Sequence, residues 1–276
     1  MDADTVQRYV FITLVIAVII AFCIPFYLSF HPIIPHSFDP GIRLGSGMFH
    51  KTLFFEDARL DYVSDIKYGH LRSGRGFEYC IAGNMGGVFL DKNVQLVEFV
   101  KLKDERYSIT DFRISLDGRG QCSFIGKIDH NPGFPVYPFE LDGQELPFIY
   151  KNDCWIVAEG TDNEIRFPLL PFLHEARGTS LYSGNGKNIY CAVLGKMGLQ
   201  APLAGYTLVR LNLLILDSNG QLVYNEVLED DATISCTAIK AVSLEGSADQ
   251  FLLVGGASKV WKYTFMDRKI TQAKRN

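Results

Sequence analysis

The chain has 276 residues, of which 47% are hydrophobic and 13% aromatic, so it can bury a sizeable core and is not intrinsically disordered. Its formal net charge is -4, and no block of like charges precedes the short Lys269–Arg275 tail. Nucleic-acid binding needs a basic surface, so we expect no nucleic-acid partner.

Residues 9–30 follow a short N-terminal tail (1–8) and carry no charge. As a helix rising ~1.5 Å per residue, the segment would span the ~30 Å hydrocarbon layer of a bilayer. Tyr9 and Phe30 bound it, and Pro25 is expected to kink its last turns. The alternatives are a cleaved signal peptide and a buried core helix. Because the apolar run is long and no small-residue cleavage site closes it, we predict an uncleaved, single-pass transmembrane helix.

The side of the membrane on which the rest of the chain lies is not settled by its basic residues, since Arg8 on one side is nearly balanced by Arg43 and Lys51 on the other. A short tail before a large domain is typical of a signal anchor, so we expect the domain on the exported, extracytoplasmic side. The cysteines favour the opposite side. Five of them follow the helix, an odd number without framework spacing, which indicates buried thiols: Cys80, Cys122, Cys154, Cys191 and Cys236.

Residues 31–49 are rich in proline and glycine and are predicted to be a linker. His31 and His36 could suggest a metal pair, but two histidines five residues apart with two prolines make an irregular site, so no metal is expected there.

Residues 50–270 contain a repeated hairpin in which two apolar runs flank a polar turn that begins with Asp. The four copies are Val88–Val97, Phe139–Leu146, Leu214–Tyr224 and Tyr263–Ile270. A pair of predicted strands precedes each copy. These pairs are 63–68 with 78–83, 109–114 with 121–126, 178–182 with 189–195, and 234–239 with 250–256. Each unit therefore contains four antiparallel strands.

The Asp residues of the four turns are spaced 51, 75 and 50 residues apart. A four-stranded unit of ~40–50 residues is typical of a β-propeller blade. We predict an all-β fold: a small β-propeller of four to five four-stranded blades, preceded by one transmembrane helix. The long interval 147–177 is either a degenerate fifth blade or an insertion, and we favour a partial blade with a loop. Lys51–Glu56 is expected to pair with the last blade and close the ring. Residues 271–276 form a basic tail.

The strands that end in Leu-Asp and turn through Gly-Gln or Asn-Gly resemble the propeller repeats of quinoprotein-like and WD-like proteins. The resemblance covers about residues 50–270. It implies the fold and leaves the function open, because the hairpin is generic.

Catalytic signals are absent from the sequence. The six histidines have no fixed catalytic partner, and nucleophile elbows, zinc-protease motifs, phosphate-binding loops and Cys-x-x-Cys pairs are all missing. Asp217–Gly220 lacks the alternating ligands of a calcium loop and is interpreted as an ordinary turn. We therefore predict no catalytic residue, cofactor or metal site, and an enzyme is not favoured.

Two proline-rich apolar loops break the repeat, Asn131–Phe139 and Pro168–His174. They either form a docking surface or pack over a neighbouring blade, and departures from a repeat tend to map to the binding face. The predicted partner-binding residues are Phe134, Tyr137, Phe139, Leu170 and Phe172.

The expected function is that of a non-catalytic, membrane-anchored accessory or scaffold subunit. Its propeller would dock on a larger membrane protein complex, so its partners would be the lipid bilayer and other membrane protein subunits. The alternative is a propeller enzyme or small-ligand sensor that uses the central channel, as the quinoprotein-like resemblance implies.

A further expectation concerns Cys80, Cys122 and Cys191, which occupy the same place in three repeats and should be separately buried and unpaired.

Overall fold

The computed structural model of the protein describes most of the chain after residue 45. The described residues are 13, 14, 18, 45, 47–102, 111–117, 121–127, 137–141, 144–151, 154–157, 159–160, 164–168, 173–184, 188–201, 205–228, 238–243 and 250–266. From residue 45 onward, their regular structure consists of eighteen β-strands and one short 3₁₀ helix, η2 (Ala58–Leu60). The all-β prediction is confirmed.

The predicted membrane segment 9–30 lies almost entirely outside the described residues. Thr13, Leu14 and Val18 are described, and they are helical and exposed. Within the described part of the chain, no helix has the length and hydropathy that a membrane crossing needs. The transmembrane helix therefore stays a prediction.

The first sheet is an antiparallel meander in the order β2-β3-β4-β5. Its strands are β2 (Val63–Gly69), β3 (Glu78–Gly83), β4 (Gly86–Asp91) and β5 (Leu96–Lys101). Both predicted strands and the predicted hairpin are present. The Asp91 carboxylate closes the hairpin by accepting backbone hydrogen bonds from Asn93 (2.9 Å) and Gln95 (2.8 Å), so the turn is set by its own side chain. Every residue of β3 is buried and β5 is largely exposed, so β5 is the outer strand.

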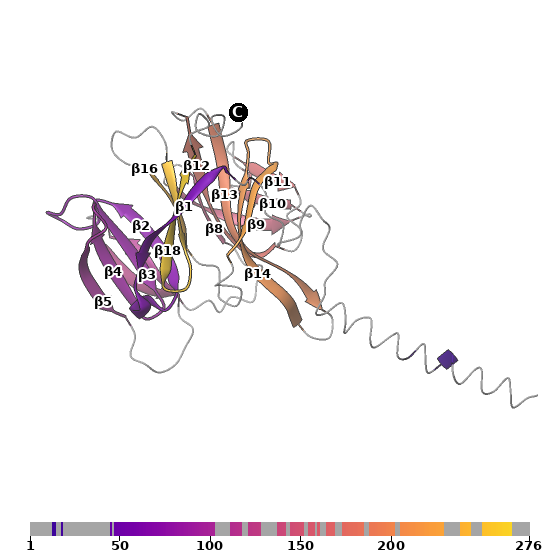
Figure 1. The fold of residues 1–276 in the computed structure, drawn as a ribbon, viewed down its shortest axis with the longest axis horizontal. Coiled ribbons are helices and arrows are strands. Elements are labelled where there is room, and N and C mark those ends of the chain that lie inside the picture. The colour runs from indigo at the N-terminus through magenta and orange to yellow at the C-terminus, as the bar shows by residue number, and fades with distance from the viewer. Residues whose placement is uncertain are drawn as a thin grey trace, which may run out of the picture.

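A second four-stranded sheet joins the two ends of the described domain, in the order β1-β18-β17-β16. Its strands are β1 (Phe49–Glu56), β16 (Ile239–Ser243), β17 (Gln250–Gly255) and β18 (Lys259–Phe265). β1 runs antiparallel to β18, with Phe49 opposite Phe265 and Glu56 opposite Lys259, and lies beside it in Figure 1. The predicted pairing of Lys51–Glu56 with the last unit is therefore confirmed, and it covers an edge of β18 that would otherwise be open. The predicted hairpin at Asp267 lies outside the described residues.

The largest sheet has eight strands in the order β11-β10-β9-β8-β12-β13-β14-β15. They are β8 (Tyr137–Leu141), β9 (Gln144–Lys151), β10 (Cys154–Val157), β11 (Ile165–Pro168), β12 (Leu173–Ser183), β13 (Asn188–Ala201), β14 (Gly205–Leu216) and β15 (Leu222–Val227). Two antiparallel meanders, β8–β11 and β12–β15, are joined where β8 pairs in parallel with β12 through Phe139 opposite Gly178.

The second predicted blade differs from the structure. Its first two strands, β6 (Asp111–Leu116) and β7 (Cys122–Lys127), form a separate two-stranded sheet. The hairpin around Asp142 was expected to complete that blade, but its strands β8 and β9 begin the next meander. The free edge of β9 pairs with β10, with Lys151 opposite Cys154. The meander that starts with β8 and β9 is therefore completed by β10 and β11, which come from the interval 147–177.

The first strands of these units face one another at the centre of the molecule. β2 packs against both β6 and β16, and β12 packs against β16 and β8. The four-stranded sheet β1-β18-β17-β16 lies between the first sheet and the eight-stranded sheet (Figure 1). On one side, Leu253 contributes to a core shared with Val63 and Ile66 of the first sheet. On the other, Leu252 contributes to a core shared with Leu181 and Leu213 of the eight-stranded sheet.

Candidate functional site

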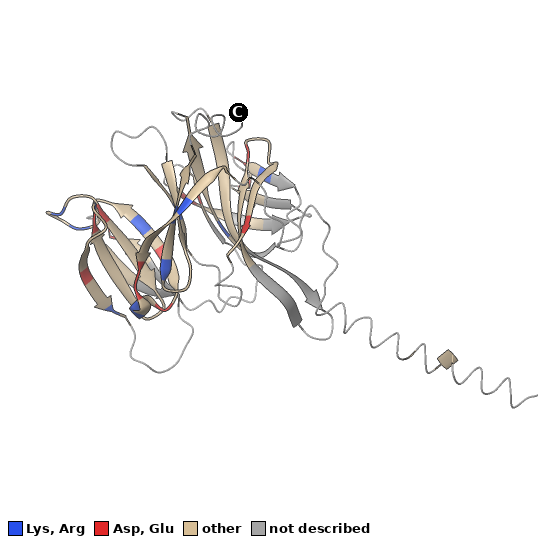
Figure 2. Cartoon of the chain, viewed as in Figure 1, with Lys and Arg blue, Asp and Glu red and all other residues tan. Residues whose placement is uncertain are grey.

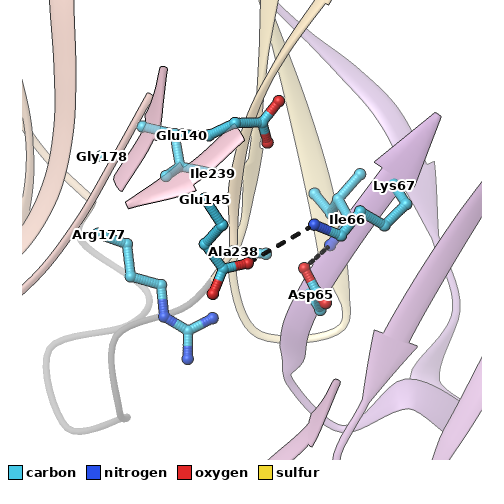
Figure 3. A pocket seen from close by; sticks show the side chains of 9 residues that line it. All are labelled: Asp65, Ile66, Lys67, Glu140, Glu145, Arg177, Gly178, Ala238 and Ile239. Atoms are coloured by element: carbon cyan, nitrogen blue, oxygen red, sulfur yellow. Dashed lines mark hydrogen bonds and ion pairs between the residues drawn. The ribbon is translucent and has the colours of Figure 1, made fainter. Parts of the chain in front are cut away.

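A small pocket lies where the first strands meet, and four strands and one strand end contribute to it. Its lining residues are Asp65, Ile66 and Lys67 from β2, Glu140 from β8, Glu145 from β9, Arg177 and Gly178 from β12, and Ala238 and Ile239 at the start of β16 (Figure 3). The pocket volume is about 30 Å³. That is room for one or two water molecules or a small ion.

The wall formed by β2 is shaped by a β-bulge at Ser64. In the pairing with β3, Val63 lies opposite Gly83 and Asp65 opposite Ala82, so Ser64 is the extra residue. Its hydroxyl donates a hydrogen bond to the Ala82 carbonyl oxygen at 3.2 Å. A bulged residue leaves the regular ladder, so the Ser64 carbonyl oxygen can accept from another sheet.

Arg177 is the donor to that carbonyl. Its guanidinium Nη1 donates a hydrogen bond to the Ser64 carbonyl oxygen, which links β12 to β2. Only 6% of Arg177 is exposed, and a buried guanidinium needs polar partners because desolvation of its charge is costly. The sequence reasoning missed Arg177, since a single arginine inside a predicted strand pair carries no motif.

Two ion pairs link the other strands around the pocket. Lys240 on β16 donates to the Glu140 carboxylate on β8, and both side chains are mostly buried. Lys67 on β2 lies 3.9 Å from the Glu145 carboxylate on β9, as the dashed line in Figure 3 marks. The second pair is weak, because Glu145 is 64% exposed and solvent screens the attraction.

Asp65 makes the fourth link. Its Oδ2 accepts a hydrogen bond from the Ile114 backbone N–H on β6 at 2.8 Å, and its Oδ1 accepts from the Ile66 N–H at 2.9 Å. The polar groups of the pocket are therefore engaged with groups on neighbouring sheets. The arrangement is thus a set of hydrogen bonds and ion pairs that hold neighbouring sheets together. Among the described residues, no group of three or more His, Cys, Asp or Glu side chains is placed to hold a metal ion.

Charged residues elsewhere are mixed in sign. Figure 2 shows acidic and basic positions interspersed on the strands of the first sheet. Arg72 there binds Glu78 and Glu98 together, with its Nη1 2.6 Å from Glu98. The glutamate partners raise the pKa of the Arg72 guanidinium.

The turn at Asp217 confirms the interpretation of that loop as ordinary turn chemistry. Its Oδ1 accepts hydrogen bonds from the backbone N–H groups of Asn219 and Gln221, both at 2.9 Å. The carboxylate is thus directed at the backbone of its own hairpin. The same turn occurs at Asp91 and at Asp117, whose Oδ1 accepts from the Gln121 N–H at 2.8 Å.

The predicted thiols are not all separate. Cys191 is buried in the core of the eight-stranded sheet, as expected, and burial raises its pKa to about 12. Cys80 and Cys122, however, share a hydrogen bond with their Sγ atoms 3.4 Å apart, and both are free thiols. The expectation of separate burial is wrong for these two, because both side chains lie in the same core between the first sheet and the sheet of β6 and β7.

The structure describes only two of the five predicted partner-binding residues, Phe139 and Tyr137. Phe139 was expected on a docking loop, but it is fully buried in the core of the eight-stranded sheet, which corrects that prediction. Its ring fits beside Gly178, where an added Cβ would lie 2.2 Å from Phe139 Cδ2. Tyr137 is the first residue of β8. Phe134, Leu170 and Phe172 lie outside the described residues, as do the predicted membrane-spanning residues Tyr9, Pro25 and Phe30.

Comparison with known proteins gave no match to a protein-family model and none to a curated protein. Among solved structures, the chain is similar to a streptogramin B lyase, with 9% identity, a TM-score of 0.32, and coverage of 79% of this chain and 98% of the lyase. A virginiamycin B lyase from Staphylococcus aureus gives 9% identity, a TM-score of 0.35, and coverage of 79% and 99%. BBS1N, solved in complex with ARL6DN, gives 11% identity, a TM-score of 0.29, and coverage of 74% and 65%. At these TM-scores the likenesses carry no conclusion about the function of this chain.

Proposed function

We propose that the protein is a non-catalytic, membrane-anchored accessory or scaffold subunit, whose β-propeller-like domain docks on a larger membrane protein complex. The observation that most supports this proposal is the use of the charged groups at the centre of the domain. Arg177, Glu140 and Asp65 each contact a group on another sheet, so they hold the sheets together.

The size of the central pocket supports the same conclusion. At about 30 Å³, it holds one or two water molecules or a small ion. The alternative function is that of a propeller enzyme or small-ligand sensor that uses the central channel.

The proposed attachment rests on the uncharged segment 9–30, whose length matches the bilayer. The proposed docking surface is formed by the two loops that break the repeat, with Phe134, Tyr137, Leu170 and Phe172 as contacts. Phe139 is removed from that set because it is buried. Proline-rich loops with aromatic side chains lose little conformational entropy when they dock.

The test is purification of the full chain from its native membrane in mild detergent, followed by identification of the proteins that co-migrate with it. The triple variant Phe134→Ser, Tyr137→Ser, Phe172→Ser should release the partner while the domain still melts cooperatively. The matched control is Leu96→Ser with Val97→Ser, which removes apolar groups that are 47% and 38% exposed on the outer strand β5 and should leave the complex intact.

Three outcomes would contradict the proposal. If the wild-type chain migrates alone, it is not a subunit. If the triple variant folds and stays bound, the docking surface lies elsewhere. If it unfolds, the loops belong to the core, as Phe139 does.

A further inference from the structure

The two neighbouring thiols lie on different sheets. Cys80 is in the middle of β3 in the first sheet, and Cys122 is the first residue of β7 in the two-stranded sheet. Their Sγ atoms are 3.4 Å apart. The backbone also fixes their approach, because the Cys122 N–H donates to the Leu71 carbonyl oxygen just after β2 at 2.8 Å. The pair therefore bridges the boundary between the first sheet and β6–β7.

The two thiols have unequal surroundings. Cys80 is fully buried among apolar side chains, including Phe89 and Ile114, whereas Cys122 is partly exposed. Burial raises the pKa of Cys80. The neighbouring Cys80 thiol, which can donate a hydrogen bond to a thiolate, lowers the pKa of Cys122. Of the charged groups near the pair, Arg72 favours the thiolate form of Cys122, and Asp65 and Glu78 oppose it. Cys122 is thus the accessible, reactive thiol, and Cys80 is the protected one.

We propose that Cys80 and Cys122 are a redox pair, which hydrogen peroxide oxidises to a disulfide that joins the first sheet to the two-stranded sheet. In the first step, the Cys122 thiolate attacks one peroxide oxygen, the O–O bond breaks, and Cys122 sulfenic acid and hydroxide form. In the second, Cys80 Sγ attacks Cys122 Sγ and displaces hydroxide as the Cys80 proton is lost. Two thiols and one peroxide give one disulfide and two waters, so cysteine sulfur is oxidised and peroxide oxygen is reduced.

The consequence of the disulfide follows from the small size of the β6–β7 sheet. A two-stranded sheet is marginally stable by itself. Its described contacts with the first sheet include the Ile114 hydrogen bond to Asp65 and the ring of Phe124, which packs on Phe89 with centroids 5.7 Å apart. A covalent bond between β3 and β7 would tie this unit to the first sheet and close a loop of about forty residues in the unfolded chain. Oxidation should therefore stabilise the domain and fix the two sheets against each other.

The oxidation state of Cys80 and Cys122 would also show in which cellular compartment the domain lies. Disulfides persist in oxidising compartments and are kept reduced in the cytosol. On the exported side the bond would be permanent, and in the cytosol it would form only during oxidative stress.

The experiment uses the full chain in mild detergent, reduced and then freed of reductant. Samples are treated with hydrogen peroxide, denatured, alkylated and mapped by peptide mass spectrometry. A Cys80–Cys122 crosslinked peptide is expected, with Cys191 still alkylated, and dithiothreitol should return both thiols. Oxidation should raise the melting temperature by roughly 10 °C, from the chain entropy of a loop of this length.

Two variants distinguish the Cys80–Cys122 disulfide from oxidation at other residues of the protein. Cys122→Ser should abolish both the crosslink and the melting shift. Cys191→Ala, which removes an isolated buried thiol, should retain both. The proposal is overturned if peroxide leaves Cys80 and Cys122 free in the wild-type chain. It is equally overturned if Cys122 is driven to sulfinic acid without a crosslink, or if it crosslinks to another cysteine. These readouts come from the wild-type protein, so they stand even if a variant fails to fold.

Discussion

Arg177 on β12 donates a hydrogen bond to the backbone carbonyl oxygen of Ser64 on β2, a residue 113 positions earlier in the chain. Ser64 is the extra residue of a β-bulge, so its carbonyl oxygen is turned out of the regular ladder, and the Arg177 side chain is almost completely buried beside it. This contact joins two sheets between which the described residues form no backbone ladder.

Replacing Arg177 should therefore weaken the whole domain. Arg177→Met keeps much of the apolar volume but leaves the Ser64 carbonyl without this donor, so the free energy of unfolding should fall by about 2–3 kcal/mol. Urea denaturation followed by tryptophan fluorescence measures the loss. Arg75→Met is the control: Arg75 is exposed, so the change should stay within about 0.5 kcal/mol. Equal stability of both variants would show that the Arg177 contact contributes nothing.

The parallel junction between β8 and β12 depends on a glycine. A Cβ at Gly178 would lie 2.2 Å from Phe139 Cδ2, and the buried ring has little room to move. Gly178→Ala should lower the free energy of unfolding by about 1–3 kcal/mol, the usual cost of overpacking.

The matched control for this change is Gly76→Ala, where nothing lies within 4 Å of the added Cβ. That variant should be nearly neutral. In addition, Gly178→Ala combined with Phe139→Leu should recover part of the loss, because the smaller side chain makes room. A Gly178→Ala protein as stable as wild type would contradict the packing at this junction.

The buried tyrosines and thiol predict instability at high pH. Burial raises the pKa of Tyr79 from 10.0 to about 12 and that of Cys191 from 9.0 to about 12, and it raises the pKa of Tyr263 further. Between pH 9 and 12 the unfolded chain loses these protons while the folded chain keeps them. Stability should therefore be complete below pH 9 and decline as pH rises through this window.

Chemical denaturation at a series of pH values measures this decline. Tyr79→Phe cannot ionise at that position, so its stability should fall less steeply between pH 10 and 12 than that of the wild-type chain. Parallel profiles for the two proteins would contradict the assignment to Tyr79.

The predicted anchor has a direct chemical test. Because residues 9–30 are expected to remain attached, N-terminal sequencing of the mature protein should find a start before residue 9, and the protein should resist extraction from membranes with alkaline carbonate. A mature N-terminus beyond Phe30 would identify a signal peptide instead.

The sequence alone determined the local units of this fold. The turn at Asp91 closes through contacts within five residues, so its hairpin was readable from the order of residues, as was the pair of strands 63–68 and 78–83 that precedes it. The pairing of β1 with β18 was also predictable, because the outer strand of an antiparallel sheet leaves one edge that needs a partner.

Only the tertiary structure decided which units meet. Whether the hairpin at Asp142 belongs with β7 or with β10 depends on the competition between two distant strands for one edge, and no local signal ranks them. The burial of Phe139 depends on a glycine 39 positions later, and the bond between Arg177 and Ser64 on a bulge in another sheet. Cys80 and Cys122 came together for the same reason. Turns are set by neighbours in the chain, whereas burial and contact between sheets are set by how every unit packs against the others.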